Sequence, residues 1–87
     1  MNDLQKLGER ANRARVDLLF IDADVALTML DLVPCSQIED LKKRRINEAL
    51  RAYSFVREHI PTVSLTPSET VALNKKMAVL KLRLSLP

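Results

Sequence analysis

The sequence has very few of the residues that small proteins use for cross-links and tight turns. It holds one cysteine (Cys35), one histidine (His59) and one glycine (Gly8). A single cysteine excludes an internal disulfide, and with one histidine it leaves too few ligands for a His/Cys zinc site. A single glycine offers almost none of the positive-φ positions that tight β-hairpins need. We therefore expect no metal and no cofactor, and the sequence disfavours an antiparallel β fold.

Long uninterrupted apolar runs are also missing. The most apolar stretch, residues 16–33, contains Asp17, Asp22, Asp24 and Asp31. Four carboxylates exclude both a signal-peptide core and a membrane span there. The lone cysteine fits a reducing compartment, so we expect a cytoplasmic protein that does not enter a membrane.

The length of 87 residues predicts one domain, residues 1–87. Apolar residues make up 47% of the chain, which is too many for a disordered segment of net charge +3. A domain of this size buries only about 60% of its unfolded surface, so it usually needs a disulfide, a metal or a partner chain. With the first two excluded, a partner chain is expected.

Two segments open with helix-capping signatures. Ser36-Gln37-Ile38-Glu39 and Thr66-Pro67-Ser68-Glu69 each place a hydroxyl three residues before a glutamate, and the second adds proline at the first helical position. They predict helices over residues 37–60 and 67–84. Residues 80–86 alternate with period two, which leaves helix or extended chain open, with helix favoured.

The first segment allows two interpretations. Residues 16–24 could form a buried strand that ends in carboxylates, or the middle of a helix over residues 12–33. We favour the helix, because its polar residues Asp17, Asp24, Thr28 and Asp31 then gather within roughly 60° of one another. The expected fold is all-α: a three-helix bundle in which an antiparallel helical hairpin packs with a third helix.

A predicted ion pair joins the first two helices. Asp22 lies within the apolar arc of the first helix and Arg45 on the apolar side of the second. A hairpin turn at Pro34–Cys35 would bring Arg45 level with Asp24, within reach of Asp22. A buried carboxylate needs such a partner, so we expect a structural Asp22–Arg45 pair.

The apolar arc of the first helix spans roughly 260°, more than two neighbouring helices cover. Exposed apolar surface of this extent indicates an association surface. We therefore expect a helical protein–protein interaction or oligomerisation module, as a homodimer or with a helical protein partner. The predicted interface residues are Phe20, Ala23, Leu27, Leu30, Val79, Leu82 and Leu86.

Two sequence motifs suggest other functions. Leu18–Ile21 followed by Asp22-Ala23-Asp24 resembles the first motif of haloacid-dehalogenase-type phosphatases, which implies a nucleophilic Asp22 and Mg²⁺. On a helix, however, residues two apart diverge, so we expect no catalytic residue and no enzyme. The basic run Lys42–Arg45 suggests nucleic acid, but acidic residues at helix-pair spacing balance it and no aromatic residue is interleaved, so nucleic-acid binding is the weaker alternative.

One stretch resembles a known repeat. Ala49, Ala52-Tyr53, Val56 and Pro61 have the spacing of the second helix of a tetratricopeptide repeat. The resemblance implies a helical hairpin of that kind. It does not imply an array, because no second copy follows at a 34-residue period.

Overall fold

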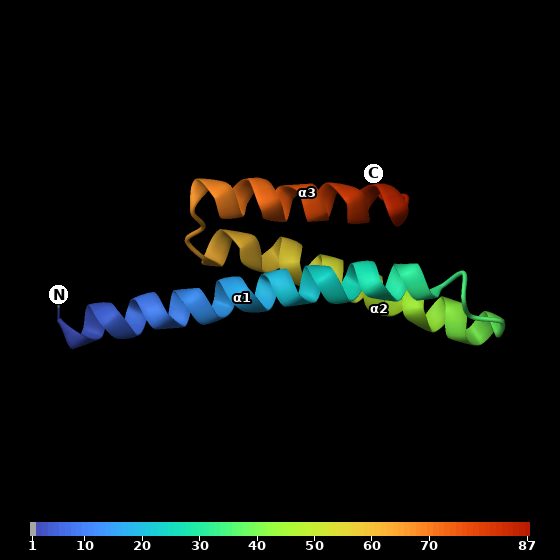
Figure 1. The fold of residues 1–87 in the computed structure, drawn as a ribbon, viewed down its shortest axis with the longest axis horizontal. Coiled ribbons are helices and arrows are strands. Elements are labelled where there is room, and N and C mark those ends of the chain that lie inside the picture. The colour runs from blue at the N-terminus through green and yellow to red at the C-terminus, as the bar shows by residue number, and fades with distance from the viewer. Residues whose placement is uncertain (1) are drawn as a thin grey trace.

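The structure, a computed structural model, describes residues 2–87 and consists of three α-helices. They are α1 (Asp3–Leu32), α2 (Glu39–His59) and α3 (Pro67–Arg83), with a short 3-10 turn at Ile60–Thr62 after α2. The helices α1 and α2 form an antiparallel hairpin, and α3 returns along one side of that pair (Figure 1). No strand occurs in the part of the chain that the structure describes. The predicted all-α three-helix fold is confirmed.

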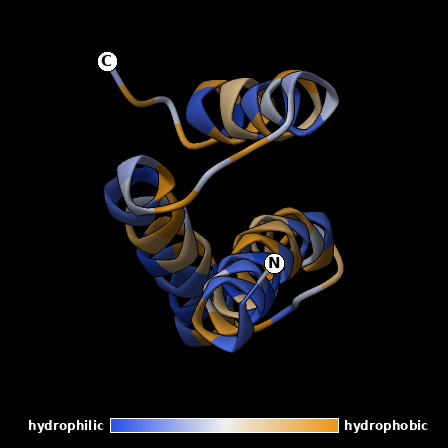
Figure 2. Ribbon diagram, turned by 90° about the vertical axis from the view of Figure 1, so that its left-hand side faces the viewer, coloured by the Kyte–Doolittle hydropathy of each residue, from blue (hydrophilic) through white to orange (hydrophobic). Residues whose placement is uncertain are grey.

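Viewed nearly end-on, the three helices occupy the corners of a triangle, with α3 above the α1–α2 pair (Figure 2). The α1–α2 contact is the most extensive in the chain, whereas α3 touches both helices over a shorter length. The molecule is therefore long and narrow, with extents of 54 × 21 × 17 Å.

The helix α1 begins at Asp3, nine residues before the predicted start at Asn12. Asn2 caps it, because its side-chain oxygen Oδ1 accepts a hydrogen bond from the backbone N–H of Gln5 at 2.8 Å. At 1.5 Å per residue, the 30 residues of α1 extend for about 45 Å. Its first turns project beyond α2 and α3 (Figure 1), and every residue from Asn2 to Ala11 is exposed.

Of the two predicted capping boxes, the one at Thr66 is confirmed. The Thr66 hydroxyl accepts from the Glu69 N–H at 3.2 Å, and the Thr66 N–H donates to Glu69 Oε1 at 3.0 Å. The box predicted at Ser36 is wrong. The Ser36 hydroxyl instead donates to the Leu32 carbonyl at 3.0 Å and accepts from Arg45 Nε at 3.1 Å, so it closes the hairpin loop. As a result α2 begins at Glu39, with no side-chain cap.

The end of α3 is helical rather than extended. The helix runs to Arg83, and Ser85 then takes a positive φ of 55°. The N–H groups of Leu86 and Ser85 donate to the carbonyls of Lys81 and Leu82 at 3.0 and 3.1 Å, which is the Schellman pattern of a helix end. This cap turns Leu86 back toward the core, where its side chain is partly buried.

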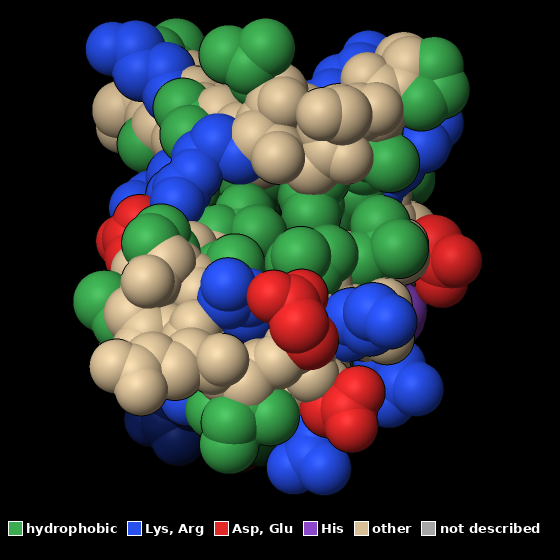
Figure 3. Space-filling view, turned by 90° about the vertical axis from the view of Figure 1, so that its right-hand side faces the viewer, with side chains coloured by type: hydrophobic (Ala, Val, Ile, Leu, Met, Phe, Trp, Pro, Cys, Tyr) green, Lys and Arg blue, Asp and Glu red, His purple; other side chains and the backbone are tan. Residues whose placement is uncertain are grey.

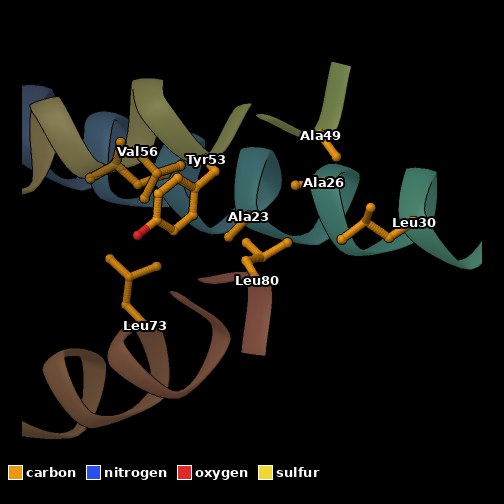
Figure 4. Close-up of a cluster of buried hydrophobic side chains, with 9 residues drawn as sticks. Ala23, Ala26, Leu30, Ala49, Tyr53, Val56, Leu73 and Leu80 are labelled. Carbon is orange, nitrogen blue, oxygen red and sulfur yellow. The ribbon is translucent and has the colours of Figure 1, made fainter. Parts of the chain in front are cut away.

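All three helices contribute to one hydrophobic core. Leu73 and Leu80 of α3 point at the small residue Ala23 of α1 and at Tyr53 of α2, and Ala49 lies beside Ala26 (Figure 4). Small side chains at these positions let the helices approach closely. The buried members of this cluster are Leu19, Ala23, Ala26, Leu30, Ala49, Tyr53, Val56, Leu73 and Leu80.

Polar contacts fix the position of α3 against α1. At the α2–α3 connection, Asn12 bonds the backbone of Ser64 twice: Asn12 Nδ2 donates to the Ser64 carbonyl at 3.0 Å, and the Ser64 N–H donates to Asn12 Oδ1 at 2.7 Å. Arg13 forms an ion pair with Glu69 at the start of α3. Further along, Lys76 pairs with Asp24 at 2.6 Å. The start of α3 is therefore held by several bonds within a short stretch.

Glu69 takes part in both the cap and the ion pair. The backbone N–H of Thr66 and the guanidinium of Arg13 both donate to its carboxylate, and they hold the pKa of Glu69 below its ordinary value of 4.5. The hydrogen bond to Glu69 in turn raises the pKa of Arg13. The carboxylate is therefore the ionised partner on which this junction depends.

We predict that this junction makes stability depend on acid pH. Because the folded-state pKa of Glu69 is lowered, its contribution is present above pH 4.5 and is lost as the pH falls through the lower folded value. In Glu69→Gln, the fall in the denaturation midpoint between pH 5 and pH 3 should be smaller than in the unmodified chain. The measurement is urea denaturation followed by circular dichroism; an identical pH profile for both chains would contradict the prediction.

We also predict that the docking of α3 depends on Leu80 and not on its neighbour Leu82. Leu80 is fully buried, whereas Leu82 is 79% exposed. Leu80→Ala should lower the free energy of unfolding by roughly 2–5 kcal/mol, while Leu82→Ala should change it by less than about 0.5 kcal/mol. Chemical denaturation compares the two variants, and equal effects would show that α3 does not pack in this orientation.

Candidate interaction surface

The residues predicted to form an interface do not lie on one surface. Ala23 and Leu30 are buried in the core of the chain itself. Phe20, Leu27 and Leu86 are partly buried and pack against that core. Val79 and Leu82, on the outer side of α3, are exposed. The structure thus brings five of the seven into or against the core and leaves two at the surface.

The apolar surface that stays uncovered on α1 lies on its other side. Six large apolar side chains there are between 36% and 79% exposed. Two alanines and one threonine between them are exposed as well. Together these residues form what we call the α1 seam: Leu4, Leu7, Ala11, Ala14, Leu18, Ile21, Val25, Thr28 and Leu32.

The seam residues follow one another at alternating steps of three and four. This is the heptad spacing of helices that pair side by side, because it keeps one stripe facing a neighbouring helix along its whole length. The stripe covers four heptads, from Leu4 to Leu32. The only polar member, Thr28, donates its hydroxyl to the Asp24 carbonyl at 2.9 Å, so the hydrogen-bonding need of that hydroxyl is met within the helix.

A shallow hollow of about 260 Å³ opens on the seam. It is lined by Ile21, Asp24, Val25, Thr28 and Met29. The first four are spaced i, i+3, i+4 and i+7, the arrangement that receives one side chain of a facing helix in knobs-into-holes packing. The seam therefore has the surface shape, as well as the spacing, of a helix-pairing site.

Charged residues line the two edges of the seam. The edge toward α3, the α3-side flank, carries Arg10, Asp17, Asp24 and Asp31. Its three aspartates are each paired within the chain: Asp17 with Arg13 at 3.3 Å, Asp24 with Lys76 at 2.6 Å, and Asp31 with Arg83 at 2.9 Å.

The edge toward α2, the α2-side flank, carries Arg15, Asp22 and Met29. Met29 marks this edge because its Sδ contacts Arg45 of α2 at 3.9 Å. Within residues 2–87, neither Arg15 nor Asp22 has a partner at ion-pair distance. The flank toward α2 therefore presents an unpaired cation and an unpaired, half-buried anion.

The predicted Asp22–Arg45 ion pair is wrong. The hairpin loop runs over residues 33–38 rather than turning tightly at Pro34–Cys35. The longer loop shifts the register, so that Arg45 comes level with Met29 instead of Asp24 and bonds Ser36 and Met29. Met29 and Asp24 are five residues apart on α1, which is about 7.5 Å along the helix axis.

Two further apolar hollows lie beside the helices. One, of about 390 Å³, lies between α1 and the end of α2 and includes Leu18 of the seam, Phe55 and His59. The other, of about 310 Å³, is lined by Leu30, Val33, Pro34, Ile46, Arg83 and Leu84. It lies at the end of the molecule where hydrophobic side chains gather below α3 (Figure 3).

The structure separates the two carboxylates of the Asp22-Ala23-Asp24 motif. Ala23 points into the core, Asp24 bonds Lys76 on the side of α3, and Asp22 lies on the side of α2. In the described part of the chain, no group of three or more His, Cys, Asp or Glu side chains is placed to hold a metal ion.

The basic run on α2 lies on a surface of mixed charge. Lys42 pairs with Glu39 at 3.3 Å. Beyond it, an open hollow is lined by both signs of charge: Asp40, Lys43, Arg44, Asn47, Glu48 and Arg51. Acidic side chains among these cations weaken their attraction for a phosphate backbone.

The single cysteine and histidine have local roles. His59 Nδ1 bonds the Phe55 carbonyl at 2.8 Å, and its ring stacks on Phe55 with centroids 4.1 Å apart. Cys35 is exposed in the hairpin loop, with its Sγ 4.0 Å from the Asp31 carbonyl.

Comparison with models of protein families, with curated proteins and with solved structures gives no match to this chain. The resemblance of residues 49–61 to a tetratricopeptide repeat stays a prediction from the sequence. Among the described helices, none has an apolar stretch of the length needed to span a bilayer.

The signal for the seam is present in the sequence. The predicted helix start at Asn12 hides this signal, because Leu4, Leu7 and Ala11 then fall outside the helix. From Asn12 onward the apolar residues spread over a wide arc, in which the seam and the core face merge. The nine extra residues of α1 separate them into two stripes, one covered and one exposed.

Proposed function

We propose that this chain is a small helical protein–protein interaction or oligomerisation module that binds through the α1 seam and carries out no catalysis. The observation that carries the proposal is the exposed heptad stripe from Leu4 to Leu32. Soluble monomers rarely leave a contiguous apolar stripe of this length in water, so the stripe supports a helical partner as its cover.

Two features outside the seam bear on the location and on the rival function. An exposed, unpaired Cys35 supports a reducing compartment, and we place the protein in the cytoplasm. Nucleic-acid binding has less support, because the cations of α2 are interleaved with Asp40 and Glu48. The seam itself carries no charged residue.

We predict that a photoreactive residue on the seam forms covalent adducts with a polypeptide. Benzoylphenylalanine replaces Thr28 on the seam or, as a control, Glu58 on the exposed polar side of α2. After irradiation of the producing cells and of the purified chain, adducts should form at position 28 and not at position 58. Mass spectrometry identifies the attached polypeptide, whether it is a second copy or another protein.

A matched pair of second substitutions decides whether the seam causes the adducts. Ile21 and Leu82 are both exposed, so Lys at either position leaves the core unchanged. Ile21→Lys should reduce the adduct yield at position 28 by about tenfold or more, because it buries a charge in the paired seam. Leu82→Lys should leave the yield unchanged. A chain without adducts at position 28 in cells and in solution would contradict the proposed function.

A further inference from the structure

The first turns of α1 have no support within the chain. Residues 3–11 extend beyond α2 and α3 (Figure 1), and all of them are exposed. The arm extends an existing helix and incurs no separate nucleation cost. Its apolar side chains stay in water, however, and only a contact from outside the described chain would bury them. Leu4 and Leu7, at 79% and 60% exposed, are the arm's apolar contacts on the seam side.

We propose that the partner is a second copy of this chain, whose α1 packs antiparallel on the α1 seam. This inference rests on the proposed function and names its partner. Leu18 lies against the partner's Ile21, and the two-fold axis passes between the two helices near residues 19–20. Residues 7–11 of each projecting arm then lie along the last turns of the partner's α1, and the first residues of the arm reach the level of the partner's hairpin loop.

This register fills the seam evenly. The small residues of the amino-terminal half face the branched residues of the carboxyl-terminal half, and large residues face each other elsewhere. A parallel pair would instead set alanine on alanine in two successive layers and leave gaps there. The layers are Leu7 with the partner's Leu32, Ala11 with the partner's Thr28, Ala14 with the partner's Val25, and Leu18 with the partner's Ile21.

The unpaired charges on the α2-side flank also select the antiparallel arrangement. In an antiparallel pair the α2-side flanks of the two chains face each other, so Arg15 lies beside the partner's Asp22. The two-fold symmetry gives a second, identical contact between Asp22 and the partner's Arg15. These are the two charged residues of the α2-side flank, and neither has an ion partner within residues 2–87. The half-buried Asp22 thereby gains the cation that Arg45 does not provide.

The α3-side flank is consistent with the same arrangement. Arg10 lies beside the partner's Asp31, which is an attractive contact. Asp17 lies beside the partner's Asp24, which is a repulsive one. The repulsion is weakened because Asp17 and Asp24 are already paired with Arg13 and Lys76 of their own chains.

A parallel pair is opposed by its charges. In a parallel pair the α3-side flank of one chain meets the α2-side flank of its partner. Each residue of the α3-side flank then lies beside the partner residue whose number is five higher. Arg10 would lie beside the partner's Arg15, and Asp17 beside the partner's Asp22. Both contacts are repulsive and both occur twice.

Disulfide trapping tests the orientation directly. In a Cys35→Ser background, two full-length variants, Ala14→Cys and Val25→Cys, are mixed in equal amounts and oxidised. The antiparallel register brings these two positions together, whereas two copies of the same variant keep their cysteines about 16 Å apart along the axis, beyond disulfide reach. We expect the mixed disulfide to dominate. Disulfides between copies of the same variant would overturn the antiparallel arrangement.

Charge reversal gives a second test, because it changes the dimer affinity in opposite directions for the two orientations. Arg15→Glu and Asp22→Lys should each weaken the dimer by about 3- to 10-fold in an antiparallel pair, since each turns two attractive contacts into repulsive ones. In a parallel pair each would strengthen it. Mixing the two variants should restore the original dissociation constant, as measured by sedimentation equilibrium.

The outcomes separate this inference from the proposed function. Two results would overturn the antiparallel homodimer and leave the interaction function in place. One is a dimer in which the charge variants associate more tightly. The other is a chain that stays monomeric while its seam position 28 cross-links to another protein. A monomer that forms no adduct at position 28 would overturn both.

Discussion

The architecture depends on one mismatch: α1 is longer than α2 and α3, and its apolar surface extends further around the helix than they cover. The 30 residues of α1 carry apolar side chains on two sides, whereas α2 and α3 have 21 and 17 residues and cover one of them. Packing satisfies the side on which Leu19, Ala23 and Ala26 lie. The other side and the projecting first turns cannot be reached by any described part of the chain. The core stripe and the association surface thus lie on two sides of the same helix, and no residue belongs to both.

The helical class could be predicted from the sequence because its causes are local. Thr66, Pro67 and Glu69 specify a helix start through bonds within four residues, and the structure contains those bonds. Ser36 and Glu39 have the same pattern but fail, because a tertiary contact from Arg45 and the Leu32 carbonyl occupy the Ser36 hydroxyl. When a candidate cap residue is also within reach of another helix, the sequence spacing alone does not determine which hydrogen bonds its side chain makes.

The errors at the candidate site have one local and two long-range causes. Asn2 and Gln5 form a local start signal that the predicted helix 12–33 does not include, and without it the heptad stripe of α1 loses its first members. The Asp22–Arg45 pair required a register that only the loop length fixes, and a loop over residues 33–38 moves Arg45 along α1 by more than a turn. The prediction of surplus apolar surface on the first helix agrees with the exposure of Leu18, Ile21 and Val25. Which edge of the arc is surplus depends on where α3 docks, and that is a long-range property.

The bonds that hold α3 are unevenly distributed along it. Its beginning is fastened by Asn12, Arg13 and the capping box, while Arg83 and Asp31 make the ion pair near its far end. We expect α3 to detach from its carboxyl-terminal end first, with the α2–α3 connection acting as the hinge. Such an opening would widen the hollow around Leu30 and Leu84, yet it would leave the opposite side of α1 undisturbed. The third helix could therefore fray and close repeatedly while an associated pair of first helices stays intact.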